Sequence, residues 1–151
     1  MRKIDWNTID SLCEKLEQMV RECGTQFKGI CGLARGGLPA AVILSHRLNI
    51  PMLNEKNLAG ALFGANKSHY LVVDDINDTG HTLKPYQGCE RVTTIVLYER
   101  ESSALRVDLV GEKITDDEWL LFPWESAARV ERDRLDYLLS RVDLNQLLGE
   151  E

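Results

Sequence analysis

Apolar side chains recur at helical spacing near the start of the chain. Across residues 5–23 they fall on one side of a helix, which predicts an amphipathic helix packed on a core. Asp5 or Thr8 can cap its first turn, and Gly24 can end it. The apolar positions of this helix are Ile9, Leu12, Cys13, Leu16, Met19 and Val20.

Continuous apolar runs and short polar breaks alternate through the rest of the chain. The run KGICGLA, and the run YLVV that ends in two aspartates, are typical of buried strands. Because strands and helices alternate, the pattern favours an α/β fold with a mostly parallel, twisted sheet flanked by helices. Strands are predicted at 28–34, 51–54, 58–63, 69–74, 91–98, 105–110 and 119–122, and a helix at 38–48.

The C-terminal region predicts a further helix, in which Asp143 and Gln146 can cap a final short turn. Its apolar face needs a partner surface, so we expect a homo-oligomer, a dimer or a tetramer. No repeat, linker or low-complexity tract interrupts the chain, so we expect one domain over 1–151, with 126–151 as a helical extension. The apolar face consists of Leu135, Leu138, Leu139 and Val142.

The composition and charge of the chain argue against several classes of protein. The chain has 151 residues and a net charge of −6, which argues against a nucleic-acid partner bound through phosphate neutralisation. No apolar run is long enough for a membrane span, and the first ten residues lack the apolar core of a signal peptide. The four cysteines show no metal-binding spacing. We therefore expect a cytoplasmic protein with reduced thiols and no membrane partner.

The segment DDINDTGHT, at the end of a predicted strand, carries the candidate chemistry. Gly80 allows a tight turn that brings backbone N–H groups close to an anion, and Thr79 and Thr82 add hydroxyl donors. Asp74 and Asp75 are acceptor-only groups that suit the two hydroxyls of a ribose, or Mg²⁺. A ligand with a phosphate, a vicinal diol and a metal-binding group fits this combination, as a 5-phosphoribosyl compound does.

Three other interpretations of the acidic and glycine-rich segments fail. An EF-hand loop from Asp75 would need Asp or Asn at Thr79 and Glu at Tyr86. The segment GALFGANKS has Asn66 where a P-loop needs its second glycine, and no dinucleotide GxGxxG occurs. An acidic loop that merely ends a strand remains the alternative for the two adjacent acids alone.

The stretch VVDDINDTGHT resembles the phosphoribosyl pyrophosphate (PRPP) signature of type I phosphoribosyltransferases: an apolar strand, two acids, two variable residues and Asp-Thr-Gly-x-Thr. FKGICGLARGGLPAAVILSHRLNIPML is similar to the first strand, pyrophosphate loop and following helix of the small xanthine-guanine and hypoxanthine enzymes. LYERESS resembles their Leu-Tyr-x-Lys-Pro-x-Ser segment, and DDEWLLFPWE their base-binding hood. The resemblance covers about residues 6–125 and implies their fold, with a small hood.

The resemblance implies the transfer of ribose 5-phosphate from PRPP to a 6-oxopurine, with release of pyrophosphate. Asp74 and Asp75 would contact the ribose hydroxyls and hold Mg²⁺, directly or through water, and Asp78 would lie near the purine N7 as a third catalytic acid. The implied 5-phosphate loop is Asp78, Thr79, Gly80, His81 and Thr82, the implied pyrophosphate loop is Arg35, Gly36 and Gly37, and the implied base contacts are Arg100, Trp119 and Leu120.

The sequence departs from this family in two places. Arg100 and Glu101 stand where the family has Lys and Pro, so the base remains open. The segment LNEKNLAGALFGANKSH is short and lacks the Ser-Tyr pair of the family's mobile catalytic loop. The leading hypothesis is a purine phosphoribosyltransferase. The alternatives are a module that senses PRPP or a nucleotide without turnover, a phosphoribosyltransferase for another base, and a purely structural protein.

Overall fold

A computed structural model describes residues 1–140 of the chain. These residues form two compact units: one comprises residues 6–117, and the other combines 1–5 with the segment that starts at Glu118. The prediction that 1–151 forms one domain with an extension from 126 stays a prediction.

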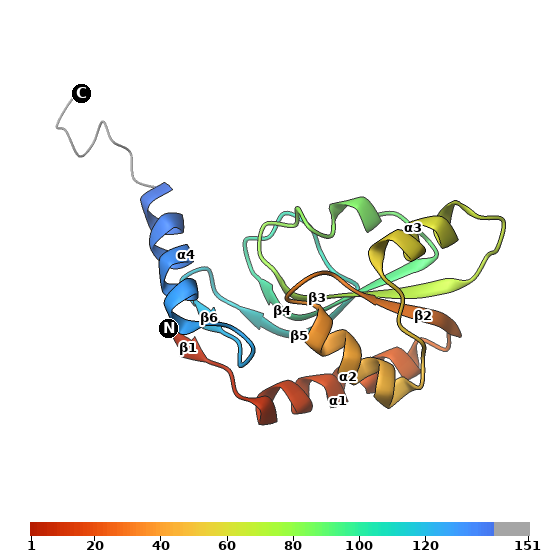
Figure 1. Cartoon of the computed structure of the whole chain (residues 1–151), viewed down its shortest axis with the longest axis horizontal. Coiled ribbons are helices and arrows are strands. Elements are labelled where there is room, and N and C mark those ends of the chain that lie inside the picture. The colour runs from red at the N-terminus through yellow and green to blue at the C-terminus, as the bar shows by residue number, and fades with distance from the viewer. Residues whose placement is uncertain (141–151) are drawn as a thin grey trace. The chain divides into compact units, whose positions relative to one another are not determined.

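The larger unit is built on a four-stranded parallel sheet in the order β2-β3-β4-β5 (Figure 1). All three neighbouring pairs are parallel, as the alternation of strands and helices predicts. The strands are β2 (Phe27–Gly32), β3 (His69–Asn77), β4 (Val92–Arg100) and β5 (Leu109–Ile114). The α/β fold class predicted from the sequence is therefore confirmed.

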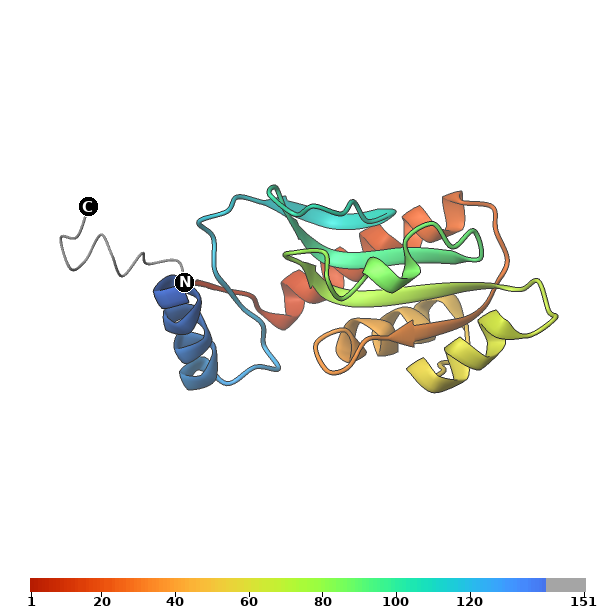
Figure 2. The same ribbon diagram turned by 90° about the horizontal axis from the view of Figure 1, so that it is seen from above.

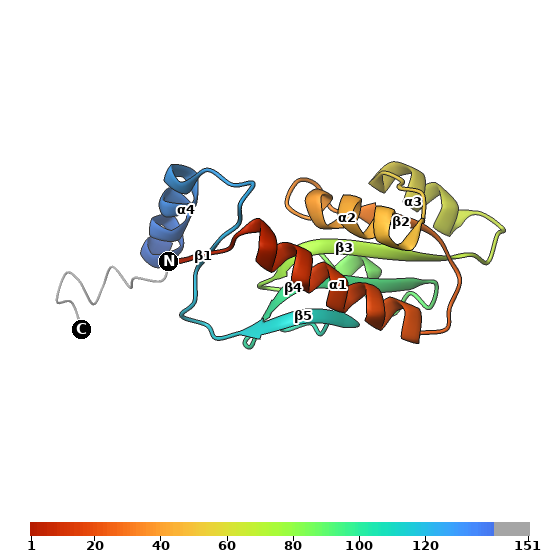
Figure 3. The same ribbon diagram turned by 90° about the horizontal axis from the view of Figure 1, so that it is seen from below.

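Helices cover both faces of this sheet (Figures 1–3). On one face, α1 (Trp6–Glu22) lies against β4 and β5, and α2 (Leu38–Leu48) lies against β2 and β3. On the other face lie α3 (Glu55–Phe63) and a three-residue 3₁₀ helix, η1 (Lys84–Tyr86). The core under α3 and η1 is apolar and contains Cys31, Leu58, Val72, Leu83, Val96 and Leu105.

The predicted strand at 58–63 is wrong, because α3 occupies this segment. The side chain of Asn54 caps the helix by accepting the backbone N–H of Asn57 at 2.8 Å. At the other end, the guanidinium of Arg91 donates to the carbonyls of Ala61 and Leu62, which the helix leaves without intrahelical partners. Caps at both ends stabilise a helix in a run whose apolar residues also suit a strand.

Other boundaries shift. β3 continues through the two aspartates to Asn77, and β5 begins at Leu109 instead of at residue 105. The predicted strand at 51–54 is reduced to a single bridge between Ile30 and Met52. The strand predicted at 119–122 is confirmed only over β6 (Leu120–Leu121), which pairs in parallel with β1 (Arg2–Lys3) in the smaller unit.

The smaller unit also contains α4 (Ala127–Ser140), close to the predicted start of the C-terminal helix. Leu135, Leu138 and Leu139 are exposed on it, while Val142 and the predicted cap of Asp143 and Gln146 lie outside the described residues. Among residues 1–140, no helix is both long enough and apolar enough to cross a membrane.

All four cysteines are free thiols. Cys13 and Cys31 are buried in the larger unit, and burial raises the pKa of each thiol to about 11. A thiol with so high a pKa is a poor nucleophile, so these two cysteines act as core residues.

Candidate active site

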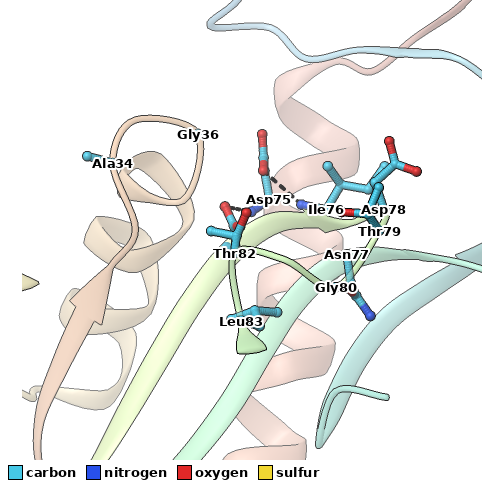
Figure 4. Close-up of a pocket in the computed structure, with 11 residues that line it drawn as sticks. Ala34, Gly36, Asp75, Ile76, Asn77, Asp78, Thr79, Gly80, Thr82 and Leu83 are labelled. Carbon is cyan, nitrogen blue, oxygen red and sulfur yellow. Dashed lines mark hydrogen bonds between the residues drawn. The ribbon is translucent and has the colours of Figure 1, made fainter. Parts of the chain in front are cut away.

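A pocket of about 260 Å³ opens at the carboxyl ends of β2 and β3, where parallel sheets bind ligands (Figure 4). One wall comes from the loop after β2, and the other from the end of β3 and the turn that follows it. Most of the residues predicted for the sugar and phosphate line this one pocket. Its lining includes Gly36, Asp74, Asp75, Asp78, Thr79, Gly80 and Thr82.

The acidic pair, Asp74 and Asp75, lines this pocket. Asp74 is 7% exposed, and its Oδ1 accepts the backbone N–H of Asp75 at 2.9 Å. Asp75 in turn accepts the N–H of Ile76 at 2.8 Å. Burial, and then the neighbouring charge of Asp75, raise the pKa of Asp74 to about 8, and burial also raises the pKa of Asp75. The pair therefore favours a ligand that brings hydroxyl donors or positive charge.

The donor set suits Mg²⁺ shared with a phosphorylated ligand. Mg²⁺ in phosphate-handling sites usually takes one or two carboxylates and fills its other positions with water and substrate oxygens. Asp74 and Asp75 supply two adjacent carboxylates in the pocket. Within residues 1–140, no group of three or more His, Cys, Asp or Glu side chains could hold a metal without the ligand. These residues therefore fit a metal that arrives with its substrate.

The loop after β2 lies close to the acidic pair. A Cβ atom on Gly36 would collide with the carboxylate of Asp75, and one on Gly37 with the carbonyl oxygen of Val73. The peptide between Ala34 and Arg35 is cis. Glycine at both positions lets this loop touch β3, which larger residues would prevent.

The turn after β3 is shaped by Gly80, whose φ of +93° suits glycine. Within the turn the N–H of His81 donates to Oγ1 of Thr79 at 3.3 Å, and the N–H of Lys84 donates to the carbonyl of Gly80 at 3.1 Å. Only the short η1 follows this turn. The groups that this turn could offer to an anion are therefore backbone N–H groups and threonine hydroxyls, without the N-terminus of a longer helix.

Asp78 is paired with Arg100, a partner that the sequence did not predict. Nε of Arg100 lies 2.9 Å from Oδ1 of Asp78. Arg100 is only 4% exposed, and its Nη1 also donates to the carbonyls of Thr115 and Asp116 at 2.9 and 3.1 Å. The guanidinium is thus fixed within the larger unit, at the end of β4.

No protein-family model matches the chain, but individual proteins resemble it. A xanthine-guanine phosphoribosyltransferase from Desulfotalea psychrophila is 27% identical over 117 residues, covering 68% of this chain and 73% of that protein. A second, from Idiomarina loihiensis, is 28% identical over 137 residues, covering 74% and 83%. A purine phosphoribosyltransferase structure from Pyrococcus horikoshii matches with a TM-score of 0.67 and 26% identity, covering 83% and 94%.

The chain is thus similar to purine phosphoribosyltransferases in both sequence and fold. A xanthine-guanine-hypoxanthine phosphoribosyltransferase from Helicobacter pylori, at 18% identity and a TM-score of 0.63, supports the fold alone. The resemblance drawn from VVDDINDTGHT, the type I phosphoribosyltransferase fold and the classification as a pentosyltransferase are confirmed.

Not every residue assigned by the family resemblance lines the pocket. Arg35 and His81 are exposed and, like Gly37, lie outside its lining, although their neighbours Gly36 and Gly80 belong to it. Trp119 and Leu120 belong to the smaller compact unit. There the Trp119 ring lies 5.2 Å from the ring of Tyr137, and Leu120 is buried in β6. The expected phosphate and base contacts of these residues stay predictions.

Sequence reasoning missed two buried polar residues, one at the end of β3 and one near the end of β4. Asn77, treated as a variable position within the motif, is 2% exposed, and Glu99 is 1% exposed. They stand opposite each other where β3 pairs with β4. A polar residue at the end of each of two apolar strands was the available signal, but only the strand register shows that the two meet.

Proposed function

We propose that this chain transfers ribose 5-phosphate from PRPP to a 6-oxopurine, that is guanine, xanthine or hypoxanthine, and releases pyrophosphate. The observation that carries the proposal is the pocket in which an acidic pair, a Thr-Gly turn and the Gly36 loop face one another. The three parts match a sugar diol, a 5-phosphate and a pyrophosphate. The names of the relatives support a purine as the acceptor.

The acidic pair would act on the sugar. Asp74 and Asp75 would accept hydrogen bonds from the ribose hydroxyls, and their negative charge would favour the cationic sugar ring of the transition state. Mg²⁺ held by this pair, directly or through water, would neutralise charge on the pyrophosphate. Backbone N–H groups from Thr79 to Thr82, with both threonine hydroxyls, would bind the 5-phosphate.

The remaining residues would bind the leaving group and the base. Arg35, on the loop that carries Gly36, would donate to the pyrophosphate oxygens. Asp78 would take or share a proton at the purine N7. Trp119 would stack on the purine, with backbone groups of Leu120 at its edge. We expect the enzyme to act as a homo-oligomer in the cytoplasm, without nucleic-acid or membrane partners.

A second candidate is a module that binds PRPP or a nucleotide without turnover. It is favoured by the segment between β2 and β3, where the nine-residue helix α3 stands in a stretch without Ser-Tyr. If the chain does catalyse the reaction, a segment other than the one between β2 and β3 would have to exclude water from the site.

The decisive experiment is a purine panel with PRPP and Mg²⁺, in which nucleotide formation is followed for guanine, xanthine, hypoxanthine and adenine. Turnover of a 6-oxopurine is the expected result. Tight binding of PRPP without turnover of any base would instead support the sensing module. Asp75→Asn serves as the site control, because it should weaken PRPP binding, whereas unchanged binding would reject the ribose role of this carboxylate.

A further inference from the structure

The side chain of Glu99 is a buried carboxylate that accepts hydrogen bonds from three donors. Its Oε2 accepts the side-chain amide of Asn77 and the backbone N–H of Val107, both at 3.0 Å, and its Oε1 accepts Nη1 of Arg106 at 3.2 Å. A buried charge is tolerated only when it is paired and hydrogen-bonded. Glu99 therefore ties the end of β4 to the segment that leads into β5.

Asn77 connects this carboxylate to the same segment at further points. Its Nδ2 also donates to the carbonyl oxygen of Leu105 at 2.7 Å, and its Oδ1 accepts the hydroxyl of Ser103 at 3.0 Å. Asn77 immediately precedes Asp78, the first residue of the proposed phosphate loop. Asn77 is itself among the residues that line the pocket. Its side-chain amide points away from the carboxylate of Asp75 (Figure 4) and makes its hydrogen bonds to the segment behind the strand end.

The segment bound by Asn77 also supports the phosphate loop from behind. A Cβ atom on Gly80 would lie 2.8 Å from Cβ of Leu105 and 3.6 Å from Oγ of Ser103. The loop therefore rests on 103–107 at Gly80, and the same segment is held to Asn77 and Glu99. Without these hydrogen bonds, the phosphate loop would lose its fixed first residue. The segment 103–107 would also no longer be held against Gly80.

We propose that Asn77 and Glu99, together with residues 103–107, form a loop anchor that holds the 5-phosphate loop in its anion-binding shape before the ligand arrives. The inference rests on the proposed function and adds Asn77 and Glu99 as positioning residues. Preorganised N–H donors bind an anion more tightly, because less ordering is needed when it binds. A purely structural role would lower stability without changing the affinity for phosphate.

Asn77→Ala tests the anchor through calorimetric binding of ribose 5-phosphate to the full chain. Loss of its hydrogen bonds is expected to weaken binding about tenfold, the factor for one to two net hydrogen bonds. Ser103→Ala removes one of these bonds and should weaken binding less. Because Ser103→Ala perturbs the core less, it tests the anchor even if Asn77→Ala does not fold.

Thr94→Val is the matched control. Thr94 also lies on β4, is 7% exposed and exchanges hydrogen bonds with Asp108: its Oγ1 lies 3.1 Å from Oδ2 of Asp108 and accepts the backbone N–H of Asp108 at 3.1 Å. It does not line the pocket. Thr94→Val should lower stability and leave the affinity for ribose 5-phosphate unchanged.

Amide hydrogen exchange gives a second measurement that does not depend on activity. Asn77→Ala should speed exchange at Lys84, whose N–H donates to Gly80 within the loop, and Thr94→Val should not. Equal affinities in the wild type and Asn77→Ala would overturn the anchor and leave the proposed function standing. A wild type that binds neither ribose 5-phosphate nor PRPP would contradict the proposed function itself.

Discussion

Arg100 is bound to Asp78 through its Nε, at 2.9 Å from Oδ1 of the carboxylate. Two backbone carbonyls hold its Nη1. A guanidinium with this many fixed acceptors is a rigid support and has little freedom to follow a ligand. The family resemblance implied that Arg100 contacts the base, whereas the structure shows it bound to Asp78, the acid proposed to act at the purine N7.

We therefore predict that Arg100→Met lowers kcat for nucleotide formation. Without its partner, Asp78 loses its fixed position, and misplacement of an acid–base group costs about 100-fold. The KM for PRPP should stay within about twofold, since the guanidinium does not line the pocket. Steady-state kinetics with both substrates varied gives this separation.

Arg100→Lys is the matched variant. Lysine keeps the charge but cannot donate from Nε and Nη1 at fixed angles, so an intermediate kcat is expected. A raised KM for the base with unchanged kcat in both variants would instead favour direct contact between Arg100 and the purine.

Gly36→Ala should weaken Mg²⁺-dependent PRPP binding about tenfold, because its methyl group would displace the Asp75 carboxylate. Stability should change little, since a carboxylate at the pocket can rotate away. Gly37→Ala should instead lower the free energy of unfolding by about 2 kcal/mol or more, because the obstacle is the backbone carbonyl of Val73. Calorimetry with Mg²⁺ and PRPP and urea unfolding measure the two effects.

Gly60→Ala is the control for these glycine variants. A Cβ atom there would meet nothing within 4 Å, and Gly60 lies inside α3. Alanine is the better helix former, so a gain of about 0.5–1 kcal/mol is expected without any change in PRPP binding. Weakened binding in Gly60→Ala as well would mean that the Gly36 result reports a general disturbance.

Burial of Asp74 predicts a stability that falls as pH rises. The pKa of its carboxyl is about 8 in the folded state, against an ordinary value of 3.8. The folded protein thus holds this proton more tightly than the unfolded chain does. The resulting contribution is fully present below pH 3.8 and is lost as pH rises through 8. Asp74→Asn cannot titrate and should avoid this loss.

In metal-free buffer, we expect Asp74→Asn to raise the free energy of unfolding by several kcal/mol at pH 8 and by clearly less at pH 5, because the raised pKa costs the wild type more stability as the pH rises. Urea unfolding at both pH values measures the difference. Glu14→Gln, at an exposed position of α1, is the control and should show no such trend. A gain that is equal at both pH values would contradict the raised pKa.

The sequence predicted the parts of the fold whose signal is local. β2, β3 and β4 each contain an apolar run, and most of the sugar and phosphate residues are close in sequence, at the end of β3 and in the turn after it. α3 was missed because Leu58, Ala61 and Leu62 also suit a strand, and its caps depend partly on Arg91, which is distant in sequence. The structure of this segment therefore depends on a contact with a residue distant in sequence, which a local pattern does not reveal.

The same reason explains the site residues that sequence reasoning missed. The partners Arg100 and Asp78 are 22 positions apart, as are Asn77 and Glu99. Only the register of β3 with β4, in which Asn77 stands opposite Glu99, brings such pairs together. A motif identifies the groups that face the ligand, but it does not identify the groups that hold them from behind.

Trp119 offers the last test, that of the base contact. It is half-buried, with its ring tilted by 53° to that of Tyr137. If one face of the indole stacks on the purine, Trp119→Ala should raise the KM for the base about tenfold, since stacking of a base on an aromatic ring is worth ~1–3 kcal/mol. Trp119→Phe should recover most of this loss.

The KM for PRPP separates stacking from a general effect on the fold. Stacking acts on the base alone, so the KM for PRPP should stay within about twofold in Trp119→Ala. Tyr137→Leu removes the ring packed against Trp119 and is the control for lost support. A rise in both KM values in Trp119→Ala, matched by Tyr137→Leu, would mean that Trp119 supports its own unit and does not bind the base.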